Sequence, residues 1–208
     1  MSPESRLGFL ALGDSYTVGE GIAESDHWPN QLATALRDAG IDVGPPNVIA
    51  ATGCTTDELT LAIDAANPAV DRALVTLLIG VNNQYRGRSI DNYAGEFADL
   101  LKRAIAFADG NPRRVIVVSI PDWSVTTFAR NSDRACDVIA SEVDAFNATA
   151  QSLAALNDVA FVDITDLTRA HPEEVVDDGL HPNAAQYARW VERLEPVARQ
   201  ALADASLY

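Results

Sequence analysis

Four polar segments that lie far apart in the chain carry residue types that can perform chemistry together. Ser15 stands in GDSYTVGEG, Gly53 in ATGCTTDEL, Asn82 in GVNNQYRG, and Asp178 and His181 in DDGLHPN. A serine hydroxyl becomes a strong nucleophile when a histidine takes its proton and a third group orients that histidine. Backbone N–H groups and asparagine amides can stabilise the oxyanion that forms when the serine attacks a carbonyl. The set therefore predicts acyl transfer by Ser15, Asp178 and His181, with Gly53, Asn82 and the Ser15 N–H as oxyanion donors.

His181 is the best placed of the three histidines to act as the base. Asp178 precedes it by three positions across the turn-forming Gly179, so its carboxylate can fold back to the imidazole Nδ1. His27 begins a predicted helix, and His171 stands in a loop that no predicted strand positions. Both positions are weaker candidates, so His181 is the predicted base.

The chain shows no pattern typical of a metal or cofactor site. Cys54 and Cys136 lack the close spacing of a CxxC motif and have no histidine pattern beside them, so we do not expect zinc. Both fit the role of small apolar core residues, and the sequence leaves a disulfide between them open. The first turn lacks a glycine-rich phosphate cradle, which argues against nucleotide or flavin binding. We expect chemistry based on proton transfer and electrostatics, with no cofactor and no metal.

Short apolar runs alternate with longer stretches of helical periodicity. The pattern predicts strands at 7–12, 47–51, 73–79, 114–120 and 159–164, helices at 27–39, 55–66, 91–108, 134–156 and 183–202, and polar loops at 80–90 and 121–133. This alternation indicates βαβ units, and hence a parallel five-stranded sheet with helices on both faces. Reactive groups in such sheets gather past the carboxyl ends of the strands, which is where the four segments fall. Without a repeat or a linker, residues 1–208 are expected to form one domain.

The four segments resemble the blocks of the SGNH or GDSL-type hydrolases, a family named after a Ser, a Gly, an Asn and a His. GDSY at 13–16, Gly53, GVNN at 80–83 and DGLH at 178–181 correspond to these blocks, and the match spans nearly the whole chain. The resemblance implies a flavodoxin-like three-layer α/β/α sandwich. It also implies that Ser15 is the nucleophile, His181 the base and Asp178 the acid that orients the base. The oxyanion donors that it implies are Ser15, Gly53 and Asn82.

Two positions depart from the pattern of that family. Tyr16 replaces the Leu of the eponymous motif, at a position that packs and does not react. Asn83 replaces the more usual Asp of the asparagine block, which leaves the donor Asn82 in place. We expect the second change to alter how the loop around Asn82 is braced.

The chain is acidic, with 15 Lys and Arg residues against 30 Asp and Glu residues and a formal net charge of -15. An acidic surface repels phosphate backbones and anionic membranes, so neither nucleic acid nor a membrane is an expected partner. The apolar run at 7–12 is too short for a signal peptide, and no stretch reaches the roughly 18 apolar residues of a membrane span. We expect a cytoplasmic protein, and the sequence leaves its oligomeric state open.

The substrate side of the predicted site is less specified than its catalytic side. Trp123 and Phe128 fall in a loop at the site edge, as candidates to line an acyl pocket, and Arg86 is a candidate contact for a polar substrate group. No long apolar flap is evident to shelter a fatty chain, so we expect a short-chain or acetyl ester as the small-molecule substrate. Two alternatives stay open: an acyltransferase on the same site, and a non-catalytic carbohydrate-binding module of this fold. Each motif alone also suits a turn or a helix cap, but four blocks in order favour a serine esterase.

Overall fold

A sheet of five parallel strands forms the centre of the fold in the computed structural model, which describes residues 6–203. The strand order is β2-β1-β3-β4-β5, and every neighbouring pair is parallel. The predicted five-stranded parallel sheet is confirmed, while residues 1–5 and 204–208 of the predicted domain lie outside the described residues. The strands are β1 (Phe9–Asp14), β2 (Asn47–Ala51), β3 (Leu74–Leu78), β4 (Val115–Val118) and β5 (Ala160–Val162).

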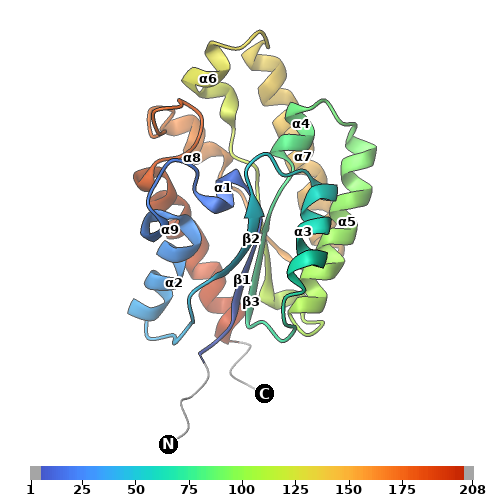
Figure 1. Ribbon diagram of the computed structural model, residues 1–208, viewed down its shortest axis with the longest axis vertical. Coiled ribbons are helices and arrows are strands. Elements are labelled where there is room, and N and C mark those ends of the chain that lie inside the picture. The colour runs from blue at the N-terminus through green and yellow to red at the C-terminus, as the bar shows by residue number, and fades with distance from the viewer. Residues whose placement is uncertain (1–5, 204–208) are drawn as a thin grey trace, which may run out of the picture.

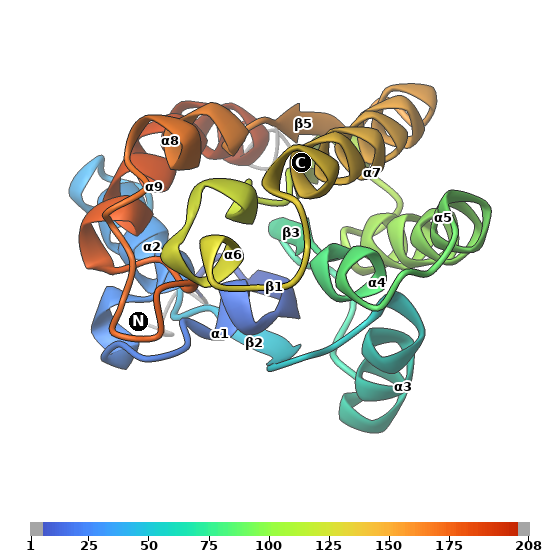
Figure 2. The same cartoon turned by 90° about the horizontal axis from the view of Figure 1, so that it is seen from above.

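Helices cover both faces of the sheet and complete a three-layer α/β/α sandwich (Figure 1). The helices are α1 (Ser15–Val18), α2 (Trp28–Asp38), α3 (Thr56–Ala66), α4 (Val81–Tyr85), α5 (Ile90–Phe107), α6 (Thr127–Arg130), α7 (Cys136–Leu156), α8 (Thr165–Ala170) and α9 (Ala184–Ala203), with 3-10 turns at Glu24–Asp26, Pro112–Arg114 and Trp123–Val125. Helices α2 and α9 pack together on one side, and α3, α5 and α7 form the layer on the other. Seen from above, α1 and α6 lie over the end of the sheet (Figure 2).

The register of β1 with its neighbours brings separate segments to one edge. β1 is buried along its whole length, as expected for an interior strand of a sheet that is covered on both faces. Asp14 pairs with Ala51 of β2, and Gly13 pairs with Leu78 of β3. Because the three strands run parallel and end nearly level, the residues that follow them emerge side by side.

Four short helices, α1, α4, α6 and α8, occupy segments that the sequence predicts as loops or leaves unassigned. The predicted polar loop at 80–90 is wrong in its first part, because Val81–Tyr85 forms α4 and carries Asn82. A five-residue segment with two asparagines has weak intrinsic helix propensity. Its packing against α7 supplies a contact that the local sequence does not reveal.

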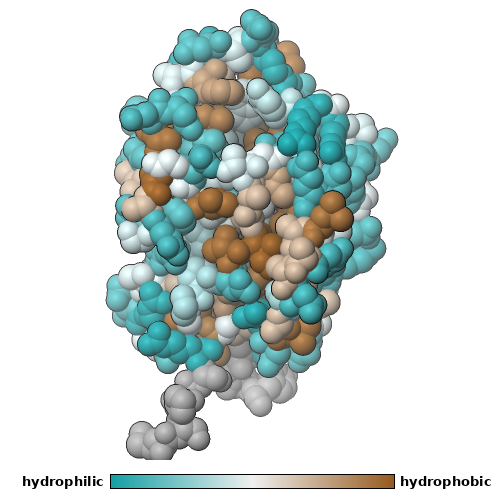
Figure 3. All heavy atoms as spheres, in the orientation of Figure 1, coloured by the Kyte–Doolittle hydropathy of each residue, from teal (hydrophilic) through white to brown (hydrophobic). Residues whose placement is uncertain are grey.

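The face shown in Figure 3 is mostly hydrophilic, with apolar side chains gathered over β2 and α3. Val48 of β2 and Leu61 of α3 are among the exposed large hydrophobic residues. Among the helices of residues 6–203, none combines the length and the apolarity that crossing a bilayer requires.

Candidate active site

Ser15 is held rigidly at the junction between β1 and α1. Asp14 caps the helix, since its Oδ1 accepts the backbone N–H of Tyr16 at 3.0 Å. On the other side, the carbonyl of Tyr16 accepts the hydroxyl of Tyr187 from α9 at 2.9 Å. These bonds fix the backbone that follows the serine, and Ser15 itself lines a cavity above the sheet.

The Ser15, His181 and Asp178 side chains form one hydrogen-bonded chain. The His181 Nε2 lies 2.9 Å from the Ser15 Oγ, and the His181 Nδ1 lies 2.6 Å from the Asp178 Oδ2. The other oxygen of Asp178 accepts the backbone N–H groups of Leu180 and His181 at 2.8 and 3.0 Å. Burial acts to raise the pKa of Asp178, but the bonds from His181 and from these N–H groups outweigh it, so the pKa lies below its ordinary value. The carboxylate is thus kept charged beside the imidazole, as a group that orients a catalytic base must be.

Tyr16 supports His181 from the side, a role that the sequence did not predict. The two rings lie 5.6 Å apart between centroids with an interplanar angle of 58°. Trp190 of α9 contacts Tyr16 edge-on at 6.4 Å. Tyr16, which was predicted to pack and not to react, therefore packs on the His181 ring. A leucine at this position would offer no aromatic ring.

Gly53 and Asn82 line the same cavity as Ser15. Gly53 follows β2 with a φ of +78°, a left-handed conformation that favours glycine. The Asn82 Nδ2 donates to the carbonyl of Cys54 at 3.0 Å, which fixes the amide. Because a side-chain amide has two N–H groups, one remains for a ligand in the cavity. The three residues predicted to supply oxyanion donors, Ser15, Gly53 and Asn82, thus line one cavity.

A known protein family matches most of the chain. The family model described as GDSL-like lipase/acylhydrolase matches residues 11–189, a span that contains both Ser15 and His181. The chain belongs to this family. Membership of the GDSL-like lipase/acylhydrolase family supports an ester hydrolase, which is the class that the four blocks predict.

Solved structures show the same fold at low sequence identity. TesA has a TM-score of 0.73 and 20% identity, and the match covers 94% of this chain and 99% of TesA. A putative GDSL-like lipase from Parabacteroides merdae has a TM-score of 0.75 and 16% identity, with 94% and 97% covered. The psychrotrophic esterase EstA from Pseudoalteromonas sp. has a TM-score of 0.65 and 16% identity, with 95% and 94% covered. No curated protein matches the chain. These likenesses confirm the predicted three-layer fold of this GDSL-family chain.

The cavity beside the serine has a volume of about 210 Å³ and a largely apolar wall. Trp123 and Phe128, the two aromatic residues predicted for an acyl pocket, both line it. Their rings meet edge to face at 6.0 Å. The sequence did not predict the remaining wall residues, because they come from separate segments that meet only in the folded chain. These residues are Tyr16, Thr52, Val81, Tyr85 and Leu180.

A polar relay from α7 anchors Trp123 in the cavity wall. The indole N–H donates to the Gln84 Oε1 at 2.9 Å, and the Gln84 Nε2 donates to Glu142 at 2.6 Å. Arg134 pairs with the same carboxylate and lies 5.9 Å from the centre of the indole ring. Trp123 is therefore a fixed wall of the cavity.

The segment that carries Phe128 is docked onto the loop between Asp178 and His181. The carbonyl of Gly179 accepts the backbone N–H of Phe128 at 3.0 Å and the hydroxyl of Thr127 at 3.2 Å. Gly179 has a φ of +70°, and a Cβ added there would lie 2.1 Å from the Thr127 Oγ1. Only glycine fits this contact, which joins the cavity wall to the loop that carries Asp178 and His181, called the catalytic loop below.

Arg86 contacts the turn at Gly53 and is not among the residues that line the cavity. One guanidinium nitrogen donates to the carbonyl of Gly53 at 2.7 Å, and another lies 3.1 Å from Glu58. These contacts brace the Gly53 turn. The guanidinium group of Arg86 thus has its partners within the protein, whereas the sequence suggested a contact with the substrate.

Asn83 joins the asparagine block to the start of α3. Its Oδ1 accepts the N–H of Thr56 at 3.1 Å, and its Nδ2 donates to the Thr56 hydroxyl at 2.6 Å. The same hydroxyl donates to the carboxylate of Glu96. An amide suits this position, because an Asp at 83 would compete with Glu96 for the single hydroxyl proton.

The two cysteines are free thiols, so the disulfide that the sequence left open is not formed in the structure. Burial raises the pKa of the Cys54 thiol to about 11. Cys54 is therefore held as a neutral thiol, which is a poor nucleophile.

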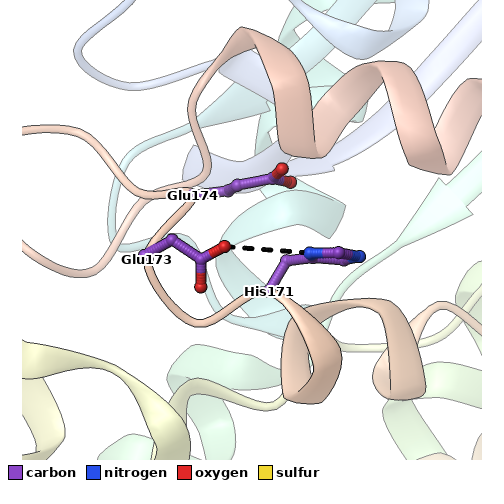
Figure 4. Close-up of side chains that lie close together, drawn as sticks. All are labelled: His171, Glu173 and Glu174. Carbon is purple, nitrogen blue, oxygen red and sulfur yellow. Dashed lines mark ion pairs between the residues drawn. The ribbon is translucent and has the colours of Figure 1, made fainter.

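One group of side chains in the described part of the chain is close enough to suggest a metal site: His171, Glu173 and Glu174 (Figure 4). Glu173 faces the His171 ring, with 3.8 Å between Oε1 and Nδ1. Glu174, however, is held by Arg189 of α9, whose Nε and Nη2 lie 2.9 and 2.8 Å from its two carboxylate oxygens. A cation would have to displace this ion pair. The group is better explained as an anchor that holds the segment before Asp178 on α9.

Proposed function

We propose that this GDSL-family chain is a serine esterase that cleaves short-chain carboxylic esters through an acyl-enzyme on Ser15. The observation that carries the proposal is the unbroken path of hydrogen bonds from the Ser15 Oγ to His181, at 2.9 Å, and on to Asp178, at 2.6 Å. A nucleophile, a base and an orienting acid in contact are the arrangement that covalent acyl transfer requires.

Acylation begins when the Ser15 Oγ attacks the ester carbonyl carbon while His181 takes its proton at Nε2. The carbonyl oxygen becomes an oxyanion, which accepts hydrogen bonds from the N–H groups of Ser15 and Gly53 and from the free N–H of Asn82. Asp178 stabilises the imidazolium through Nδ1. The C–O bond to the alcohol then breaks, and His181 returns the proton to the departing alkoxide, which leaves the acyl group on Ser15.

Deacylation repeats these steps with water as the nucleophile. His181 takes a proton from water, the hydroxide attacks the acyl carbon, and the same donors hold the second oxyanion. When this intermediate collapses, His181 protonates the Ser15 Oγ and the carboxylic acid leaves. The first and the last proton transfer join the Ser15 Oγ and the His181 Nε2, which lie 2.9 Å apart.

The size of the cavity supports a short acyl group. Its volume of about 210 Å³ lies below the roughly 300–1,000 Å³ of pockets that enclose drug-sized ligands. The wall near Val81, Trp123 and Phe128 offers apolar surface but no charged side chain. A small apolar acyl group matches both properties.

A panel of p-nitrophenyl esters with acyl groups of two to ten carbons tests this function. Wild type is expected to hydrolyse the shortest esters best, and Ser15→Ala to lose the activity. An added acceptor alcohol reveals any transfer product, because an acyltransferase would form a new ester in place of the free acid. No hydrolysis of any ester by wild type, or equal rates for wild type and Ser15→Ala, would contradict the proposal.

A further inference from the structure

The short helix α4 carries an oxyanion donor at its start and a cavity wall at its end. Asn82 and Tyr85 are three positions apart, so they lie on neighbouring parts of one helical face. Val81, one position earlier, also lines the cavity. An acyl group whose carbonyl oxygen sits at Asn82 therefore runs along α4 towards the Tyr85 ring.

Tyr85 stands between the cavity and solvent. It is 50% exposed, whereas Trp123 and Val81 in the same wall are 2% and 7% exposed. Its ring lies 5.7 Å from Trp123 and 6.5 Å from Phe128 between centroids. The three aromatic rings form a cluster with Tyr85 as the member on the outside.

Tyr85 is also held differently from the other two rings. Trp123 is fixed by a hydrogen bond from its indole N–H, and the backbone of Phe128 is bonded to the catalytic loop. Tyr85 makes ring contacts, and within residues 6–203 its hydroxyl has no hydrogen-bond partner. Its ring can therefore be removed or enlarged without breaking a polar network.

We propose that Tyr85 is the specificity-determining residue that limits the length of the acyl chain by closing the outer end of this apolar cavity. The inference rests on the proposed esterase function and names the residue that selects its substrate. A short acyl group fits between Val81 and Trp123, while a longer one must displace the Tyr85 ring or turn into solvent. Without the ring, further methylene groups can lie against the faces of Trp123 and Phe128 that Tyr85 now covers.

Tyr85→Ala, Tyr85→Phe and Tyr85→Trp, assayed on p-nitrophenyl acetate, butyrate and octanoate, test this inference. For Tyr85→Ala, the ratio of kcat/KM for octanoate to that for acetate is expected to rise about tenfold or more, the gain that roughly two newly buried methylene groups supply. Tyr85→Phe keeps the ring and is the matched control, with ratios within about twofold of wild type. Tyr85→Trp enlarges the ring and is expected to lower butyrate relative to acetate.

The outcomes distinguish failure of this inference from failure of the proposed esterase function. An unchanged octanoate-to-acetate ratio in Tyr85→Ala, with acetate hydrolysis retained, would overturn the role of Tyr85 and leave the esterase intact. Absence of ester hydrolysis in wild type would instead contradict the proposed function. Tyr85 is half exposed, so loss of its ring leaves no buried void, and Tyr85→Trp tests the same limit in the opposite direction.

Discussion

Asp14, the residue before Ser15, is expected to make the protein less stable as the pH rises. Its side chain is fully buried, and its Oδ2 has no hydrogen-bond partner among the described residues. Burial raises the pKa of Asp14 from 3.8 to about 7, against the lowering effect of the bond from the Tyr16 N–H. A carboxyl with a raised pKa in the folded state keeps its proton at pH values where the unfolded chain has lost it.

The sign and size of the effect follow from this difference in proton binding. Between about pH 4 and pH 7 the folded state holds a proton that the unfolded state does not, so the free energy of unfolding falls as the pH rises and levels off above pH 7. For a shift from 3.8 to about 7, the loss between pH 5 and pH 8 is about 2 to 3 kcal/mol. Asp14→Asn removes this titration and keeps the side-chain shape. The unpaired amide costs about 1–3 kcal/mol at every pH and does not change the pH dependence.

Urea unfolding of wild type and Asp14→Asn at pH 5 and pH 8, followed by tryptophan fluorescence, measures the effect. The stability of the variant relative to wild type should rise by about 2 to 3 kcal/mol between the two pH values, because the other titrations are common to both proteins. A difference that stays the same within about 0.5 kcal/mol would refute the reasoning, since it would mean that Asp14 ionises alike in the folded and unfolded chains.

Three further predictions concern the site. Asn82→Ala should lower kcat by about 100- to 1,000-fold if its free N–H binds the oxyanion, and steady-state kinetics showing a negligible loss would remove it from that role. Gly179→Ala should lower kcat/KM by roughly 100-fold, because its Cβ would meet the Thr127 Oγ1 at 2.1 Å and shift the catalytic loop or α6 by about an ångström. Adding Thr127→Ala should recover part of that activity, and a double variant no better than the single one would show that the clash is not the cause. Asn83→Asp should destabilise the fold by about 1–3 kcal/mol in thermal or urea unfolding, because the carboxylates of residues 83 and 96 would share one hydroxyl proton. Combining it with Glu96→Gln should recover stability. An Asn83→Asp variant as stable as wild type would contradict this.

The sequence was sufficient for the sheet and for the order of the reacting groups. Apolar runs bounded by polar or turn-forming residues precede Ser15, Gly53 and Asn82, which is why β1, β2 and β3 could be predicted. Parallel strands then require the segments that follow them to meet at one edge. His181 depended more on the DGLH motif, because α8 and a loop separate it from β5.

Contacts between loops could not be predicted in the same way. The packing of Tyr16 on His181, and of Thr127 on Gly179, joins segments that no local pattern relates. Arg86 illustrates the difficulty. From the sequence alone, an arginine after the asparagine block could contact either the substrate or the protein. The structure shows that its guanidinium binds the carbonyl of Gly53. α4 was missed for a similar reason, because five residues are too few to show a helical period.

The central claim is that Ser15 is the nucleophile activated by His181, and labelling with a fluorophosphonate probe tests it most directly. Such a probe reacts with a serine hydroxyl that a base has activated, so labelling reports on the step proposed here. Mass spectrometry of the labelled peptides should find one adduct on Ser15 of wild type, much slower labelling of His181→Ala and none at all in Ser15→Ala. An unlabelled wild type, or equal labelling of Ser15→Ala, would contradict the account.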